Sequence, residues 1–402
     1  MTLQGANGQN ATPGSVSKSD LHTLLAAGLT SLPIYSAMMG WWTKSGHVAG
    51  VGYSSIDPVQ VRKQLDDMRE RGFNGMTMAW YGQGDMSDVA FDAWRQAVEA
   101  SGTGFKIALR VNEAIIDSVH CPSGDRQSCV IGQLKYASKY FTSSVYLAHD
   151  VIGDGYGWRP VVTFFFNTTV AACCDWNAVR DAVTGDFNPI LVLRQDKGGF
   201  TGQTPNMDGA FAWGVYPEGF AYDKDFDAAA QSFPGKYIWA DASKGFDDQL
   251  ASWGSNRVTP QRCGNRWLDT WTHINSDFAD SVTGTVDAVI VPTWNDYEEG
   301  TEIETGIDNC YTVSTPVVSG SIVSWALNSS SAGASLATVD HFTLYLGNSK
   351  GDLSVLQDNV PATATSTPLP ATIPSGTWTI YVQMIGKPSI INRMSSPATY
   401  TK

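Results

Sequence analysis

The strongest constraint on the fold of this chain is a regular alternation of short apolar segments with helix-like segments, which begins near Leu32 and ends near Glu304. The residues within each apolar segment are continuous rather than alternating, as is typical of parallel strands buried on both faces. Eight such segments are present: Leu32–Met39, Gly75–Trp80, Phe105–Val111, Pro160–Phe166, Pro189–Arg194, Gly209–Val215, Lys236–Ala240 and Asp287–Thr293. Eight strands with helices between them predict an α/β protein with a closed (β/α)8 TIM barrel.

Helix-like segments connect most of these runs. Asp57 and Pro58 have the sequence of a helix cap and first turn, and the apolar positions that follow them are Val59, Val61, Leu65 and Met68. Further helices are expected around Val89–Ala100, Gly132–Phe141, Trp176–Val183, Phe226–Phe233 and Arg266–Phe278. The crossover between Gln195 and Asn206 is rich in Gly and has little helix signal. A doubly wound open sheet is the structural alternative, but no G-x-G-x-x-G motif follows the first run.

The composition divides the chain into three parts. Residues 1–30 begin with a stretch rich in Gly, Asn, Ser and Thr and are predicted to form a flexible segment. Residues 31–311 contain the barrel pattern, whereas residues 312–402 are rich in Ser, Thr, Pro and Val. Short alternating runs recur in this last part at Val317–Trp325, Thr338–Leu346, Leu353–Asp358, Thr377–Ile385 and Ala398–Thr401. They predict a small β-sandwich of the immunoglobulin or fibronectin III type, which we interpret as a structural appendage.

The charge of the chain argues against several classes of partner. The 402 residues include 26 basic and 39 acidic side chains, which gives a net charge of −13. Such a chain has no basic surface to release counterions from nucleic acid or to bind an anionic membrane. No apolar run reaches the ~18 residues that predict a transmembrane helix. We expect a monomer that binds neither nucleic acid nor membranes.

The cysteines indicate an oxidising compartment. Six are present, at positions 121, 129, 173, 174, 263 and 310. The first two flank a turn-rich loop, the adjacent middle pair can form a bridge or remain thiols, and the last two can join two late loops. An even number in this context predicts two or three structural disulfides, and such bonds persist outside the cytosol. We therefore expect a secreted, extracellular protein without a zinc site, because no paired Cys-x-x-Cys motifs occur.

The residues that end the eight runs indicate the chemistry, because the active sites of TIM barrels lie at the C-terminal ends of the strands. These residues combine aromatic rings with amides and carboxylates: Trp80, Tyr81, Asp85, Asn112, Trp213, Tyr216, Asp241, Trp294, Asn295, Asp296, Glu298 and Glu299. The six histidines are scattered, and none indicates a catalytic role. Aromatic rings stack on sugar faces, amides and carboxylates bind hydroxyls, and paired carboxylates supply acid and base for glycoside cleavage. The set therefore points to a polysaccharide or oligosaccharide.

Three acids follow the last apolar run within four residues. In an extended backbone Asp296 and Glu298 share a face, whereas in a helical turn Asp296 and Glu299 converge. Gly300 suits a tight turn at this point, and so we favour the second arrangement. Two carboxylates held this close raise one of the two pKa values, which places a protonated acid beside an ionised base. The alternative is a solvated acidic loop or a calcium site.

The segment Thr293–Gly300 reads Thr-Trp-Asn-Asp-Tyr-Glu-Glu-Gly and resembles the signature of glycoside hydrolase family 71, which reads close to Thr-Trp-Asn-Asp-Tyr-Gly-Glu-Ser. Met207–Pro217 resembles the family's strand-six motif, and Arg266-Trp267 resembles a pair that precedes its last strand. The likeness covers most of residues 31–305. It implies a secreted α-1,3-glucanase (mutanase) with a barrel fold, inversion of configuration, and no metal or other cofactor.

The resemblance also implies roles for single residues. Asp296 and Glu299 match the catalytic acids, with Asp85 as a weaker match, and we expect Glu299 to be the acid and Asp296 the base, with the reverse assignment open. The remaining residues of the set above are expected to bind substrate. Glu298 departs from the family signature, which has Gly at that position. The following segment, Gly300–Glu304, is also similar to family 99, the endo-α-mannosidases and endo-α-mannanases. A hydrolase of that kind and a non-catalytic glycan-binding protein are the alternatives.

Overall fold

The computed structural model describes residues 14–47, 51–151, 153–200, 204, 206–214, 220–279 and 286–402. Contacts between residues divide the chain into two compact units. The larger unit consists of Leu25–Thr259 and Thr270–Glu302, and it contains the barrel. The smaller unit consists of residues up to Leu24, Pro260–Asp269 and Ile303–Lys402, and it contains the C-terminal sheets.

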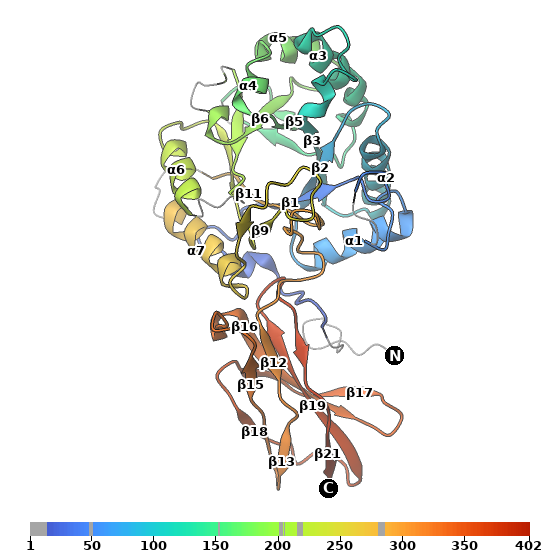
Figure 1. The fold of residues 1–402 in the computed structure, drawn as a ribbon, viewed down its shortest axis with the longest axis vertical. Coiled ribbons are helices and arrows are strands. Elements are labelled where there is room, and N and C mark those ends of the chain that lie inside the picture. Colours follow the sequence, from blue (N-terminus) through green and yellow to red (C-terminus); the bar gives the residue numbers. More distant parts are fainter. Residues whose placement is uncertain are drawn as a thin grey trace. The chain divides into compact units, whose positions relative to one another are not determined.

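Eight parallel strands form a closed barrel in the larger unit (Figure 1). In barrel order they are β1 (Ile34–Met39), β2 (Gly75–Trp80), β3 (Lys106–Asn112), β5 (Trp158–Phe165), β6 (Leu191–Gln195), β7 (Gly209–Phe211), β8 (Tyr237–Asp241) and β11 (Ala288–Val291). The ring is complete because β11 pairs with β1 and β3 pairs with β5. The short strand β4 (Ala148–Asp150) runs antiparallel beside β5. The predicted TIM barrel is confirmed, and the open sheet is not formed.

Helices flank the barrel (Figure 1). They are α1 (Pro58–Glu70), α2 (Met86–Ser101), α3 (Arg126–Ala137), α4 (Thr168–Ala171), α5 (Trp176–Ala182), α6 (Phe220–Ala230) and α7 (Asn265–Ala279). The first begins as predicted, since the Asp57 side chain accepts a hydrogen bond from the Val59 N–H at 2.9 Å. Val61, Leu65 and Met68 are buried, but Val59 is 76% exposed and does not belong to the buried face. Within the described part of the chain, none of the helices is both long and apolar enough to span a bilayer.

Two connections refine the sequence prediction. Helix α3 begins well before the predicted Gly132, because Asp125 caps it by accepting the Ser128 N–H at 3.1 Å. Its last turn continues as a 3-10 helix over Ser138–Tyr140. In the described part of the crossover after Gln195, the only helical element is the 3-10 turn Lys197–Gly199, in agreement with its weak helix signal.

The smaller unit contains three small antiparallel sheets. One pairs β12 with β15, one has the order β13-β14-β18, and one has the order β17-β16-β19-β20 with β21 beside β19. The strands are β12 (Tyr311–Val313), β13 (Val317–Ser319), β14 (Ile322–Ser324), β15 (Leu327–Ser329), β16 (Val339–Gly347), β17 (Leu353–Pro361), β18 (Ser366–Pro368), β19 (Thr377–Gly386), β20 (Arg393–Met394) and β21 (Ala398–Thr401). Val313, Val323 and Phe342, one from each sheet, share a single apolar core. The immunoglobulin-like sandwich and the boundaries at 30/31 and 311/312 stay predictions.

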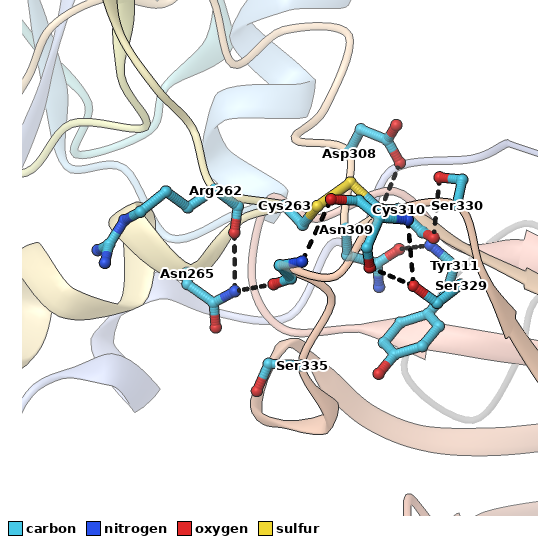
Figure 2. The surroundings of a disulfide bond; sticks show 12 residues. Arg262, Cys263, Asn265, Asp308, Asn309, Cys310, Tyr311, Ser329, Ser330 and Ser335 are labelled. Atoms are coloured by element: carbon cyan, nitrogen blue, oxygen red, sulfur yellow. Dashed lines mark hydrogen bonds between the residues drawn. A yellow bond between two sulfur atoms is a disulfide. The ribbon is translucent and has the colours of Figure 1, made fainter.

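Three disulfides are present. They join Cys121 to Cys129, the adjacent Cys173 and Cys174, and Cys263 to Cys310. Figure 2 shows the last of these, which lies in the smaller unit among polar backbone contacts. The Cys310 N–H donates to Asp308 Oδ1 at 3.0 Å, and the Cys310 carbonyl accepts the Ser330 N–H at 2.9 Å. The disulfide therefore connects two loop segments that are also held by hydrogen bonds.

Candidate active site

A cavity of about 470 Å³ lies at the C-terminal ends of the barrel strands, where TIM-barrel enzymes carry their active sites. Its wall combines aromatic rings, three basic side chains, a histidine and three acids. The lining residues are Met39, Trp41, Lys44, His47, Ala79, Tyr81, Arg110, Asn112, Glu113, Phe165, Trp213, Phe246, Trp253, Arg257, Asp296 and Glu299. A cavity of this size and composition is typical of a binding site for a small polar ligand.

The segment after β11 turns so that Asp296 and Glu299 line the same cavity. Oδ1 of Asp296 accepts hydrogen bonds from the backbone N–H groups of Glu298 at 3.1 Å and Glu299 at 3.0 Å. The Asp296 N–H in turn donates to Thr293 Oγ1 at 2.9 Å. Gly300 has φ +59°, a left-handed conformation that suits glycine. The local hydrogen bonds thus form the compact turn that the sequence favours over an extended segment.

Burial raises the pKa of the Asp296 carboxyl. Its side chain is almost completely buried, and the negative charges of Glu299 and Glu298 act in the same direction, so its pKa lies well above the ordinary value. Oδ2 has no hydrogen-bond partner within the described residues. A buried carboxyl oxygen of this kind favours the protonated form.

The Glu299 carboxyl has a raised pKa as well. Burial is the largest cause, and it outweighs the Trp253 indole N–H, which donates to Oε1 at 3.2 Å, and the positive charges of Arg110 and Arg257. Two neighbouring carboxyls with raised pKa values retain a proton at pH values where an exposed carboxyl has lost it. A carboxyl that keeps its proton in this range is suited to act as a general acid.

A short hairpin after β8 carries Trp253. It is framed by two antiparallel strands, β9 (Phe246–Asp247) and β10 (Val258–Thr259). Within its loop, the fully buried Asp248 accepts the Arg257 backbone N–H at 2.6 Å and the Arg257 Nε–H at 2.8 Å. Trp253 itself is 44% exposed. The hairpin therefore places a partly exposed indole directly beside Glu299.

Glu298 does not line the cavity, but it contacts a residue that does. Its side chain is 2% exposed, and Oε2 lies 2.8 Å from Nδ1 of His47. The His47 ring stacks on Trp41, with ring centroids 4.3 Å apart and an interplanar angle of 14°. His47 and Glu298 are 251 positions apart, and so no spacing in the sequence connects them.

Arg110 is a buried cation in the cavity wall. Its guanidinium carbon lies 4.6 Å from the ring centroid of Trp213 and 5.7 Å from that of Phe165. Burial lowers its pKa to about 10, so the group stays charged near neutral pH. Arg110 was not among the predicted site residues. The sequence feature that indicates Arg110 as a site residue is its charge inside the apolar run Phe105–Val111. A charged residue there must find a polar or aromatic environment within the barrel.

Three further predicted residues lie in the cavity wall: Tyr81, Asn112 and Trp213. Burial raises the pKa of the Tyr81 hydroxyl far above its ordinary value, so Tyr81 acts as a neutral hydrogen-bonding group. Asn112 caps the 3-10 helix Glu113–Ile116 by accepting the Ala114 N–H at 3.0 Å. The predicted Tyr216 lies outside the described residues.

Four predicted substrate contacts are buried outside the cavity wall. Trp80 donates through Nε1 to Asp88 of α2 at 3.1 Å, and Trp294 packs beneath the guanidinium of Arg71, at 4.8 Å. Asn295 accepts the Met39 N–H at 2.8 Å, and Asp241 accepts the Gly214 N–H at 2.9 Å. These side chains hold strands and helices together around the cavity.

Asp85 also lies outside the cavity wall, at the N-terminus of α2. Oδ1 accepts the Ser87 N–H at 2.8 Å, and Oδ2 pairs with the Lys44 ammonium. Burial raises the pKa of Asp85, but the hydrogen bonds from Lys44 and Ser87 outweigh it and leave the pKa below its ordinary value. An ionised helix cap of this kind is a poor proton donor.

Within the described residues, no three His, Cys, Asp or Glu side chains are grouped as metal ligands.

Comparison with known proteins gives a likeness in fold. No family model matches the chain, and no curated protein matches it. A solved structure of a glycoside hydrolase family 99 endo-α-mannosidase from Bacteroides thetaiotaomicron is 15% identical, with a TM-score of 0.50 over 67% of this chain and 87% of that one. A family 99 endo-α-mannosidase from the same organism in complex with bis-tris propane is 14% identical, with a TM-score of 0.49 over 68% and 86%.

A glycoside hydrolase family 5 protein from Bacteroides vulgatus is more distant, with 9% identity and a TM-score of 0.40 over 88% of this chain and 89% of that one. These structural neighbours are glycoside hydrolases. At such identities the likeness to the family 99 enzyme shows the fold alone, a TIM barrel.

Proposed function

We propose that this protein is a glycoside hydrolase that cleaves an α-linked polysaccharide with Asp296 and Glu299 as its acid–base pair. The observation that carries the proposal is the presence of two carboxyls with raised pKa values on the wall of one cavity, at the catalytic end of a TIM barrel. Glycoside cleavage uses two carboxyl groups, one of which protonates the departing oxygen. The partly exposed indole of Trp253 beside Glu299 adds an aromatic surface on which a sugar ring can stack.

We assign the acid to Glu299 and the base to Asp296. Glu299 is only partly buried, which lets its carboxyl reach the oxygen between two sugar units. Asp296 is fixed by two backbone N–H groups on Oδ1, an arrangement that orients a carboxylate toward water or a sugar hydroxyl. The pKa directions do not support this division, because burial raises both values and that of Asp296 lies well above its ordinary value. The assignment therefore rests on access and orientation, with the reverse assignment as the alternative.

We propose α-1,3-glucan as the substrate, on the strength of the family 71 resemblance in Thr293–Gly300. An α-mannan is the second candidate, supported by the likeness of Gly300–Glu304 to family 99 and by the similarity in fold to a family 99 endo-α-mannosidase. Three disulfides suit an oxidising compartment, and we accordingly propose that the enzyme acts outside the cell.

The test is the release of reducing ends from a panel of α-1,3-, α-1,4- and α-1,6-glucans and α-mannans. Asp296→Asn and Glu299→Gln should each lower kcat by about 10²–10⁴-fold while the fold is retained, as is usual for groups in general acid–base catalysis. Asp66→Asn, an exposed carboxylate on α1 that pairs with Arg62, is the matched control and should keep full activity. A fully active variant at Asp296 or Glu299 would remove that residue from the mechanism. Glycan binding without any cleavage would favour the non-catalytic alternative.

A further inference from the structure

His47 lines the cavity and contacts a buried carboxyl through one ring nitrogen. Nδ1 of His47 lies 2.8 Å from Oε2 of Glu298, where the carboxyl oxygen accepts the Nδ1–H. Nε2 is then the ring nitrogen left for a second partner. A buried carboxylate that fixes the tautomer and orientation of a histidine is a recurrent device of active sites.

The dyad of His47 and Glu298 is connected to the catalytic pair through Trp253. The His47 ring is 13% exposed and lines the cavity. It stacks on Trp41, and its centroid lies 5.8 Å from that of Trp253, whose Nε1 donates to Glu299. His47 and Glu299 therefore both adjoin the partly exposed indole of Trp253.

We propose that His47, held by Glu298, is a substrate-positioning residue that hydrogen-bonds through Nε2 to a hydroxyl of the sugar unit stacked on Trp253. The inference rests on the proposed function and adds a specific contact to it. It also gives a role to the acid that stands where the family 71 signature has Gly. Without the carboxylate the imidazole loses its fixed tautomer, so Glu298 acts through His47 and not on the sugar.

The test measures kcat and KM for His47→Ala, Glu298→Ala, Glu298→Gln and the double variant H47A/E298A. His47→Ala should raise KM about tenfold, the equivalent of one hydrogen bond of about 1.4 kcal/mol, and change kcat less than about threefold. Glu298→Ala should also raise KM. The KM of the double variant should not exceed that of His47→Ala, because the two residues act as one unit. Glu298→Gln keeps an acceptor for the Nδ1–H and should restore most of the affinity.

His22→Ala is the matched control. His22 makes the same kind of contact, 2.8 Å from Nδ1 to Asp20 Oδ1, but it lies in the 3-10 helix Leu21–Leu24 of the smaller unit. It should leave KM unchanged. A KM within twofold of wild type for His47→Ala, or multiplicative effects in the double variant, would overturn the proposal. Thermal unfolding checks that each variant is folded, and if Glu298→Ala is not, His47→Ala and Glu298→Gln decide.

Titration of α-1,3-gluco- and α-manno-oligosaccharides into Asp296→Asn, with and without His47→Ala, separates this contact from the hydrolase proposal. If His47→Ala weakens binding tenfold but the wild-type protein cleaves none of these glycans, the contact is supported and the hydrolase proposal is refuted. Cleavage by wild type with unchanged binding in the His47→Ala background would refute the contact and leave the hydrolase standing. A wild-type protein that neither binds nor cleaves these glycans would refute both.

Discussion

Asp287 is a half-buried carboxyl whose ionisation should cost stability at neutral pH. It directly precedes β11, and its Oδ2 accepts the Ile238 N–H at 2.8 Å. Burial raises its pKa from 3.8 to about 6 despite this hydrogen bond. The folded state therefore binds the proton more tightly than the unfolded chain. The stability that the protonated Asp287 carboxyl gives to the folded state is complete below about pH 4 and is lost as the pH rises through 6.

The expected magnitude follows from the shift of about two pKa units. At 1.36 kcal/mol per unit, ionisation of Asp287 lowers the free energy of unfolding by about 2–3 kcal/mol above pH 6. Asp287→Asn keeps an acceptor for the Ile238 N–H and cannot ionise. The variant should therefore be about 2–3 kcal/mol more stable than wild type at pH 7.5 and almost equally stable at pH 4.

Urea unfolding followed by tryptophan fluorescence at both pH values measures this difference. Asp287→Ala is the internal control, because it removes the charge and also the acceptor of the Ile238 N–H; it should be less stable than Asp287→Asn at both pH values. The reasoning is refuted if Asp287→Asn gives no gain at pH 7.5, or if the gain is the same at pH 4.

Three further predictions concern the cavity and the smaller unit. Trp253→Phe keeps a stacking face but loses the N–H that lowers the pKa of Glu299, so the limb of the kcat/KM pH profile that reports Glu299 should move to higher pH. Arg110→Met removes a positive charge that also lowers the pKa of Glu299, so it should move the same limb to higher pH. A pH profile that does not move in either variant would contradict these two predictions. The double variant C263S/C310S opens a 47-residue loop and should lose about 4 kcal/mol in urea unfolding by the chain-entropy relation, whereas equal stability would show that the loop is held by other contacts.

The barrel is the part of this protein that the sequence determined by itself. Each of the eight predicted apolar runs overlaps a barrel strand, and the Asp57 cap lies at the predicted position. Apolar runs and capping residues are local properties, since a strand buried on both faces needs a continuous apolar run wherever it lies in the barrel. The turn from Asp296 to Glu299 is local in the same way, because a spacing of three residues and a following Gly suffice to form it.

The composition of the cavity was decided by the tertiary structure. Neighbouring residues of a strand point to opposite faces, so Ala79 lines the cavity while Trp80 packs against α2. The sequence placed Trp80 at the end of a strand, but it did not say which face that position occupies. Closure of the barrel sets the face, because it fixes the register of each strand against its neighbours.

The same closure brings together residues that no local pattern connects. His47 and Glu298 meet across 251 positions, and Arg110 of β3 comes to lie on Trp213, which follows β7. Short-range propensity acts over a few residues, whereas these contacts exist only once the first and last strands have paired. The sequence therefore determined a barrel with an acidic turn at its end, and the closed ring decided which side chains surround that turn.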